Sequence, residues 1–319
     1  MHTCMIIHPD ELSRAWIDQM AEAGITQLGI HPVGGSETAA ASLTDLVALL
    51  QTADYRALID YAKERGMTVV YEMHAAGYLM PARLFDEHPT YFRVNAEGER
   101  TAFCNFCVSE PAALALFATR AAALADALYG TEDTFYFWMD DGYGLHCHCE
   151  RCRSLSPSDQ QQIAINAMLN KIRKKRPHAR MAYLAYMDSI QPPTVPPADG
   201  VFLEYAPFEK YTAKGEEAPQ KIARERAMLK PLMQCFSKQP HRVLEYWYDN
   251  SMRSHWKKPP ARFMLNEEAM HADMADYRAL GFEEVATFAC FLGKDYRDLY
   301  GDVDITPFTN AIMESEETP

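Results

Sequence analysis

The stretch Thr134–Arg153 reads TFYFWMDDGYGLHCHCERCR and combines an aromatic run, two adjacent acids and a group of cysteines. The run Phe135–Met139 has the length and aromatic content of a buried strand. Asp140 and Asp141 follow it, and glycines then end the strand. The pattern predicts a strand that carries carboxylates at its C-terminal end, with thiols in the loop just beyond.

Short β-rich runs of this kind recur along the chain, and each is followed by a turn and a helical pattern. The eight predicted strands are Thr3–Pro9, Thr26–Pro32, Met67–His74, Phe135–Met139, Ala179–Asp188, Val201–Pro207, Arg242–Asp249 and Glu284–Leu292. The predicted helices are Glu11–Ala23, Leu43–Gln51, Tyr55–Arg65, Glu110–Tyr129, Pro157–Arg176, Pro219–Phe236 and Asn266–Leu280. Strands separated by helices indicate a parallel sheet, and eight such units in 319 residues favour a (β/α)8 TIM barrel.

An open, doubly wound sheet is the rival architecture, and it would need a glycine-rich phosphate loop after its first strand. The residues after that strand, from His8 to Glu11, provide none, and Gly34-Gly35 after the second strand is a weak signal. We therefore expect residues 1–319 to form one α/β barrel domain, with the tail 305–319 at its periphery. The loops after the third and fourth strands are too long for plain connections.

Composition narrows the choice of partners and of compartment. The formal net charge of −13 argues against nucleic acid or an anionic membrane as a partner. No apolar run reaches the ~18–20 residues that span a bilayer. The N-terminus does not resemble a signal peptide. We expect a cytoplasmic protein without a disulfide framework, and a homo-oligomer remains open.

Five of the eight cysteines fall in two tight clusters: Cys104, Cys107, Cys147, Cys149 and Cys152. The cluster after the fourth strand supplies three soft ligands, and the Cys104-x-x-Cys107 pair can supply the fourth. Four thiolates are typical of a closed, structural zinc site. The alternative ligands are His146 and His148. The sequence thus predicts a zinc ion that joins the third and fourth loops and takes no part in catalysis.

Polar and aromatic residues gather where the predicted strands end, which is where barrel enzymes place their active sites. They are His8, His31, Glu72, His74, Asp140, Asp141, Tyr186, Glu204, Tyr205, Glu245, Trp247 and Asp249. Aromatic faces stack on sugar rings, while carboxylates and histidines bind hydroxyl groups. The inventory therefore indicates a carbohydrate site.

Two carboxyl groups on opposite sides of the bound sugar are the minimum for glycoside hydrolysis. The fourth and seventh strands lie opposite each other in an eight-stranded ring, so Asp141 or Asp140 pairs with Glu245. Glu204 is the competing second carboxylate. Side chains alternate along a strand, so the two aspartates cannot both point inward while the strand stays regular. Trp247 is the aromatic residue expected to stack on the sugar.

Two other functions are compatible with the same residues. The first is a carbohydrate-binding barrel without catalysis. The second is a metal-dependent hydrolase or isomerase that uses His8, His31, Glu72 and His74 as ligands. Metal-dependent amidohydrolase barrels require a His-x-His pair on the first strand, where this chain has only His8.

Several segments resemble the domain-of-unknown-function 4838 family, which is regarded as a glycoside-hydrolase-like barrel. They are FCNFCVSEP, MDDGYGLHCHCERC, LSPSDQQ, AYLAYMD, VFLEYAP and LEYWYDNS. The resemblance covers nearly the whole chain. It implies a glycosidase-like barrel that acts on carbohydrate.

More distantly, the cysteine pattern is similar to that of family 42 β-galactosidases, in which an Asn-Glu acid on strand four precedes a C-x-C-x-x-C loop. This similarity implies an acid at Asp141 and a nucleophile at Glu245. The metal ligands that it implies are Cys107, Cys147, Cys149 and Cys152. The chain departs from that family because Asp140-Asp141 replaces Asn-Glu. The aspartate pair is also similar to the Asp-Glu of family 20 hexosaminidases, where the substrate's acetamido group attacks and Glu245 would not be needed.

Overall fold

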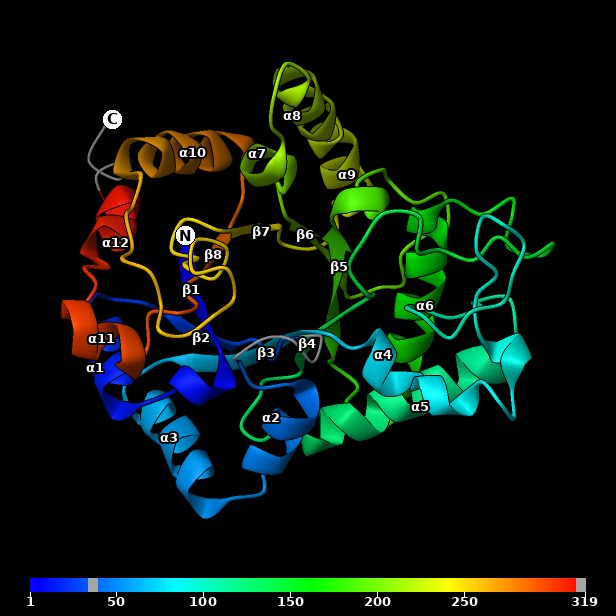
Figure 1. Cartoon of the computed structure of the whole chain (residues 1–319), viewed down its shortest axis with the longest axis horizontal. Coiled ribbons are helices and arrows are strands. Elements are labelled where there is room, and N and C mark those ends of the chain that lie inside the picture. The colour runs from blue at the N-terminus through cyan, green and yellow to red at the C-terminus, as the bar shows by residue number, and fades with distance from the viewer. Residues whose placement is uncertain (34–39, 314–319) are drawn as a thin grey trace. The chain divides into compact units, whose positions relative to one another are not determined.

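The eight strands form a closed parallel barrel in sequence order, as the alternation of strands and helices predicts (Figure 1). The computed structural model describes residues 1–33 and 40–313, so Gly34, Gly35 and the end of the tail lie outside the described residues. The strands are β1 (His2–Ile7), β2 (Gln27–Ile30), β3 (Thr68–His74), β4 (Thr134–Trp138), β5 (Arg180–Ala185), β6 (Val201–Tyr205), β7 (Arg242–Glu245) and β8 (Glu284–Phe288).

Helices connect successive strands. The α-helices are α1 (Arg14–Glu22), α2 (Leu43–Leu49), α3 (Ala53–Glu64), α4 (Ala76–Leu79), α5 (Pro111–Ala127), α6 (Pro157–Ile172), α7 (Glu209–Thr212), α8 (Ala218–Ala227), α9 (Leu229–Cys235), α10 (Glu267–Leu280), α11 (Lys294–Tyr300) and α12 (Thr306–Met313). Four short 3-10 helices are η1 (Pro9–Glu11), η2 (Ala82–Leu84), η3 (Pro89–Tyr91) and η4 (Met187–Ser189). None of the described helices has both the length and the apolar character that crossing a bilayer requires.

The chain divides into two compact units, of which the first comprises Met1–Glu72, Leu128–Glu132 and His241–Pro319. Within it, β1 pairs in parallel with both β2 and β8. Arg242 of β7 forms a fully buried ion pair with Glu72 of β3, at 2.6 Å. Gly29 of β2 lies so close that an added Cβ would be 2.7 Å from Ile6 and 3.1 Å from the Glu72 carboxylate. This position therefore requires glycine.

The second unit comprises Met73–Ala127 and Asp133–Pro240. In it, β5 pairs with β6 over five residues, from Met181 to Ala185. Helix α6 begins at Pro157, as the sequence predicts, and follows the N-cap Ser156, whose hydroxyl accepts from the Asp159 N–H. The single helix predicted over 219–236 is instead α8 and α9. A break falls there because Pro231 has no N–H and its ring excludes the preceding helical turn.

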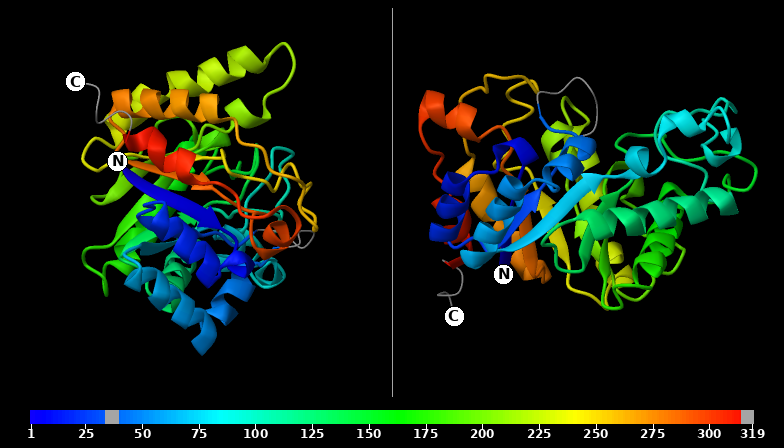
Figure 2. Two further views of the ribbon diagram at one scale, coloured as in Figure 1. Left: turned by 90° about the vertical axis from the view of Figure 1, so that its left-hand side faces the viewer. Right: turned by 90° about the horizontal axis from the view of Figure 1, so that it is seen from below.

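The segment after β3 is longer than an ordinary connection, and it contains α4, η2, η3 and a β-bridge between Val94 and Arg100. It is coloured cyan in Figure 2 and lies at the N-terminal end of α5. Several strands are shorter than predicted. In particular β5 gives way to η4, and β7 ends at Glu245.

Candidate active site and metal centre

Four cysteines of the second unit lie together: Cys107, Cys147, Cys149 and Cys152. Their sulfur atoms are all within 4.8 Å of one another. The Cys107 Sγ is 3.6 Å from that of Cys149 and 3.8 Å from that of Cys152. A tetrahedral site with Zn–S bonds of about 2.3 Å has sulfur atoms about 3.8 Å apart. The group can therefore hold a metal ion, and Cys107 belongs to it whereas Cys104 does not.

The cysteine group is braced by the loop after β3 and by helix α6. The Val94 N–H donates to the Cys147 Sγ at 3.4 Å, and the His148 N–H donates to the Val94 carbonyl at 2.8 Å. The buried Gln160 side chain of α6 pairs with both backbone groups of Cys147, at 2.9 Å each. The imidazole rings of His146 and His148 pack on each other and lie outside the sulfur group.

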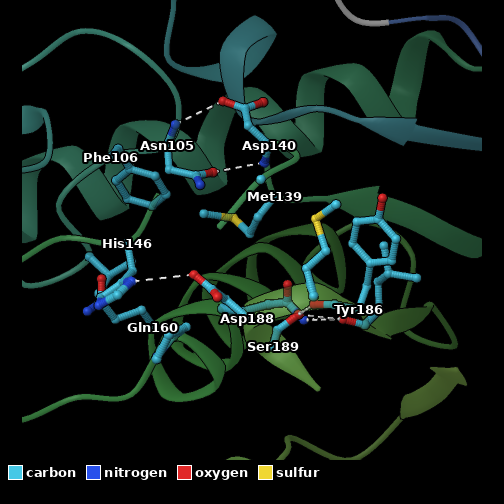
Figure 3. Close-up of a pocket in the computed structure, with 15 residues that line it drawn as sticks. Asn105, Phe106, Met139, Asp140, His146, Gln160, Tyr186, Asp188 and Ser189 are labelled. Atoms are coloured by element: carbon cyan, nitrogen blue, oxygen red, sulfur yellow. Dashed lines mark hydrogen bonds and ion pairs between the residues drawn. The ribbon is translucent and has the colours of Figure 1, made fainter. Parts of the chain in front are cut away.

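Asp140, which follows β4, is held by the loop after β3 (Figure 3). Its Oδ1 accepts from the Gly77 N–H at 3.1 Å, and its Oδ2 accepts from the Asn105 N–H at 2.9 Å. Its own N–H donates to the Asn105 Oδ1 at 2.9 Å. N–H donors stabilise a carboxylate in a fixed position. The Asp140 carboxyl group is therefore held in a fixed position.

Asn105 is a functional candidate that the sequence analysis missed. Its backbone has φ 55°, in the left-handed region that asparagine tolerates better than most residues. Its Nδ2 also donates to the Leu145 carbonyl at 3.1 Å, so the side chain joins the loop after β3 to the loop after β4. The available signal was its position between Cys104 and Cys107, in the segment that carries a member of the sulfur group.

Asp141 lies beside a histidine rather than in an enclosed site. Its Oδ2 is 3.5 Å from the His74 Nε2, and its side chain is 54% exposed. The His74 Nδ1 bonds to the Met139 carbonyl at 2.6 Å, which places the proton of the neutral ring on Nδ1. The Nε2 of neutral His74 is then an acceptor next to Asp141.

Glu204 of β6 is fully buried under Trp138. The Trp138 indole N–H donates to the Glu204 Oε2 at 2.8 Å, and the Trp138 ring lies 5.1 Å from the His74 ring, edge on. Glu204 thus orients Trp138, which supports His74.

A cavity opens beside Asp140 and encloses about 560 Å³, part of it open to solvent (Figure 3). Asp188 lies across it from the end of β4, and its Oδ2 accepts from the Gly144 N–H at 2.5 Å. The His146 ring beside Asp188 holds the pKa of that carboxyl below its ordinary value. The cavity is lined by Asn105, Phe106, Val108, Met139, Asp140, Gly142, His146, Pro157, Gln160, Gln161, Leu184, Tyr186, Met187, Asp188 and Ser189.

In the first unit, His8 and His31 follow β1 and β2 and repeat the arrangement of His74. The His8 Nδ1 bonds to the His31 carbonyl, and the His31 Nδ1 bonds to the Glu72 carbonyl, each at 2.8 Å. Both rings therefore keep Nε2 as an acceptor. Burial lowers the pKa of His8, which favours its neutral form, and its buried Nε2 has no hydrogen-bond partner among the residues that the structure describes.

Trp256 is an aromatic residue near His8 that the sequence analysis missed. Its side chain is 38% exposed, and its ring centroid lies 6.5 Å from that of His8 and 6.2 Å from that of Phe291. Asp249 in the same unit accepts from the Ser251 N–H, and burial raises its pKa. Trp256 stands in a loop without regular strand or helix periodicity, so no sequence pattern marked it.

Two side chains at the end of β7 and just after it, both predicted to face the sugar, lie against helix α10. Trp247, expected to stack on a sugar, is buried, and its indole N–H donates to Asp273 of α10 at 3.0 Å. Glu245, expected on the inner side of the barrel, is also buried and accepts from the Tyr277 hydroxyl of α10. Alternation along the strand places Arg242 on the other side, where it meets Glu72.

Tyr205 and Glu72, which were also predicted to contact the sugar, are buried. The Tyr205 side chain lies in the core, whereas Tyr186 lines the cavity. The Glu72 carboxylate is engaged by Arg242. Within the described part of the chain, the four cysteines are the only group of three or more metal-ligating side chains close enough to share an ion.

The architecture is that of a (β/α)8 barrel, and several solved structures share it. The β-galactosidase from the psychrophilic Marinomonas ef1 is similar, with a TM-score of 0.56 at 10% identity, over 99% of this chain and 59% of that chain. A GH5-4 broad specificity endoglucanase from an uncultured bacterium has a TM-score of 0.53 at 14% identity, over 95% and 83%. A glycoside hydrolase family 5 enzyme from Prevotella bryantii B14 has a TM-score of 0.51 at 10% identity, over 95% and 86%. Such identities show a shared fold.

The chain belongs to the family described as Domain of unknown function (DUF4838), whose sequence profile matches residues 46–279. This confirms the resemblance drawn from the cysteine and strand-end motifs. No curated protein matches the chain.

Proposed function

We propose that this chain is a glycoside hydrolase in which Asp141 is the proton donor and Asp140 is a fixed anion. The observation that carries the proposal is that two adjacent carboxyl groups differ in hydrogen bonding and in exposure. Asp140 is held by two backbone N–H groups, whereas Asp141 is more than half exposed and lies beside His74. Two carboxyl groups with separate environments are what acid and anion roles require.

The nucleophile in this proposal comes from the substrate. Glu245 bonds to α10 and Glu204 bonds to Trp138, so neither is presented for attack on a sugar. We propose that the oxygen of a 2-acetamido group attacks C1 while the bond from C1 to the leaving oxygen breaks. Asp141 gives its proton to the leaving oxygen, and Asp140 accepts the N–H of the acetamido group. Water then adds to C1, returns a proton to Asp141 and regenerates the acetamido group.

The metal in this proposal is a structural zinc ion. Cys107, Cys147, Cys149 and Cys152 fill the four positions of a tetrahedral site, and three of these side chains are fully buried. A closed site of this kind supplies stability and leaves no position for substrate. Its part in the reaction is to fix the loop that carries Asn105, two residues before Cys107.

We propose further sugar contacts within each unit separately. They are made by expected residues that keep an acceptor atom or line the cavity. His8 and Asp249 offer acceptors in the first unit, where Trp256 takes the stacking role first given to Trp247. His31 keeps its Nε2 as an acceptor in the same unit, and Tyr186 lines the cavity of the second unit.

A screen of aryl glycosides with and without a 2-acetamido group tests this function. Wild type should hydrolyse only the acetamido series. Asp141→Asn and Asp140→Asn should each lose about 10²-fold or more in kcat/KM. Glu245→Gln, which keeps an acceptor for Tyr277, should retain activity. Activity confined to substrates without the acetamido group, or its loss in Glu245→Gln alone, would contradict the mechanism.

The other functions considered from the sequence make different predictions in the same screen. A carbohydrate-binding barrel would bind the glycosides without releasing the phenol. A metal-dependent hydrolase using His8, His31, Glu72 and His74 is disfavoured because Arg242 already neutralises Glu72. The single-domain organisation, the cytoplasmic location and the homo-oligomer stay predictions.

A further inference from the structure

The cavity of the second unit carries a charge pattern that the proposed chemistry does not require. Two carboxylates line it, from Asp140 and Asp188. Among its 15 lining residues there is no lysine or arginine, and His146 is the only group able to become cationic. The cavity therefore attracts cations and repels anions.

Both carboxylates are held in place by backbone N–H groups, and Asp188 in addition lies beside the His146 ring. Asp140 accepts from the N–H groups of Gly77 and Asn105, and Asp188 accepts from that of Gly144. The His146 Nδ1 lies 3.9 Å from the Asp188 Oδ2 on one side of this carboxylate. Carboxylates only accept hydrogen bonds, so a ligand must bring the donors.

The remaining walls are apolar and suit a ring with C–H faces. They include Phe106, Leu184 and Met187, together with the ring of Tyr186. Figure 3 shows the Met139 side chain between Asp140 and Asp188. The cavity thus combines two carboxylates with apolar walls and is partly open to solvent.

Asp141 does not itself line the cavity, but both of its chain neighbours, Asp140 and Gly142, do, so the cavity adjoins the segment that carries the proposed proton donor. We infer that it binds a sugar ring carrying a free amino group, as the leaving-group unit of the substrate. The ammonium group would supply donors and positive charge to Asp188, while the ring packs on the apolar walls. The place in the reaction rests on the proposed function, but the binding preference does not.

Binding of monosaccharides to the full chain tests this inference without catalysis. The probes are glucosamine, galactosamine, their N-acetyl forms and glucuronate, titrated by calorimetry or ligand-observed NMR. Wild type should bind the free amines about fivefold or more tightly than the N-acetyl forms, and glucuronate most weakly. High salt should reduce the preference of the wild-type protein for the free amines over the N-acetyl forms. This test needs no variant.

Asp188→Asn should abolish the preference for the amine. Asp126→Asn, which removes a carboxylate of α5 that pairs with Lys175 elsewhere in the same unit, should keep it. Equal binding of amine and N-acetyl forms by wild type, or an unchanged preference in a folded Asp188→Asn protein, would overturn the inference. If the amine preference holds while every glycoside resists hydrolysis, the proposed function fails and the binding site stands.

Discussion

Asn105 determines the position of Asp140 through a reciprocal pair of hydrogen bonds. Asn105→Ala removes the acceptor for the Asp140 N–H and the donor to the Leu145 carbonyl. We expect kcat on the acetamido glycosides to fall at least tenfold and stability to fall by about 1–3 kcal/mol. Kinetics and thermal unfolding measure the two effects.

Asn105→Gly is the matched control, because glycine tolerates the left-handed backbone of this position but lacks the side chain. It should recover part of the stability that alanine loses while its kcat remains low. Wild-type kcat in the glycine variant would show that the side chain does not position Asp140.

Glu11 gives the stability a defined pH dependence. Burial raises its pKa from 4.5 to about 7, although its carboxylate accepts from the N–H groups of His8 and Gly293. A raised pKa means that the folded state binds the proton more tightly. The contribution of Glu11 to the free energy of unfolding is therefore complete below pH 4.5 and is lost as pH rises through 7.

From this shift we expect about 2–3 kcal/mol of stability to disappear between pH 5 and pH 8. Denaturant unfolding of wild type and Glu11→Gln at both pH values isolates the effect, because the neutral glutamine cannot titrate. Glu22→Gln, at an exposed position of α1, should keep the wild-type slope. An identical pH slope in wild type and Glu11→Gln would refute the assignment.

At the scale of elements, the cysteine group joins the loops after β3 and β4. Cys107→Ser should lose the metal and lower the melting temperature, whereas Cys104→Ser should retain about one zinc per chain. The pair is matched because both residues lie in one turn and only Cys107 belongs to the sulfur group. Metal analysis after purification without chelators measures the outcome. Full zinc content in Cys107→Ser would contradict the ligand set.

Most elements could be predicted from the sequence, but the directions of side chains on β7 could not. The predicted strand Arg242–Asp249 carries polar and aromatic residues on both of its alternating faces, so either face is a plausible inner side. What decides the direction is Glu72, 170 residues away, which pairs with Arg242 inside the first unit. On the opposite face, Glu245 accepts from the Tyr277 hydroxyl of α10, and the Trp247 indole N–H donates to Asp273 of the same helix. The local periodicity of a sequence does not show which distant residues a side chain will contact.

At the scale of the whole molecule, the barrel was predictable because eight strand and helix units leave few alternatives. The cysteine spacing likewise predicted a group of cysteines that join the two loops, and the structure gives Cys107 as its fourth member. Asn105, Trp256 and the cavity with Asp188 were not predicted. Each depends on how irregular loops fold, and loops carry no periodic signal.

The buried pair of Glu72 and Arg242 contributes to the stability of the whole chain. Arg242→Met removes the guanidinium group that faces a fully buried carboxylate at 2.6 Å. We expect a loss of about 3–5 kcal/mol in the free energy of unfolding. The double variant Glu72→Gln with Arg242→Met should be more stable than Arg242→Met alone, because no charge is then left without its partner. Denaturant unfolding that shows additive losses would contradict this coupling.

The leaving-group dependence of hydrolysis tests the role of Asp141 most directly. Aryl 2-acetamido glycosides with phenols of different acidity are compared between wild type and Asp141→Asn. An acidic phenol departs without a proton, so the variant should be nearly as fast as wild type on it. On the least acidic phenols it should be about 10²–10⁴-fold slower. An equal loss for every leaving group would contradict Asp141 as the proton donor.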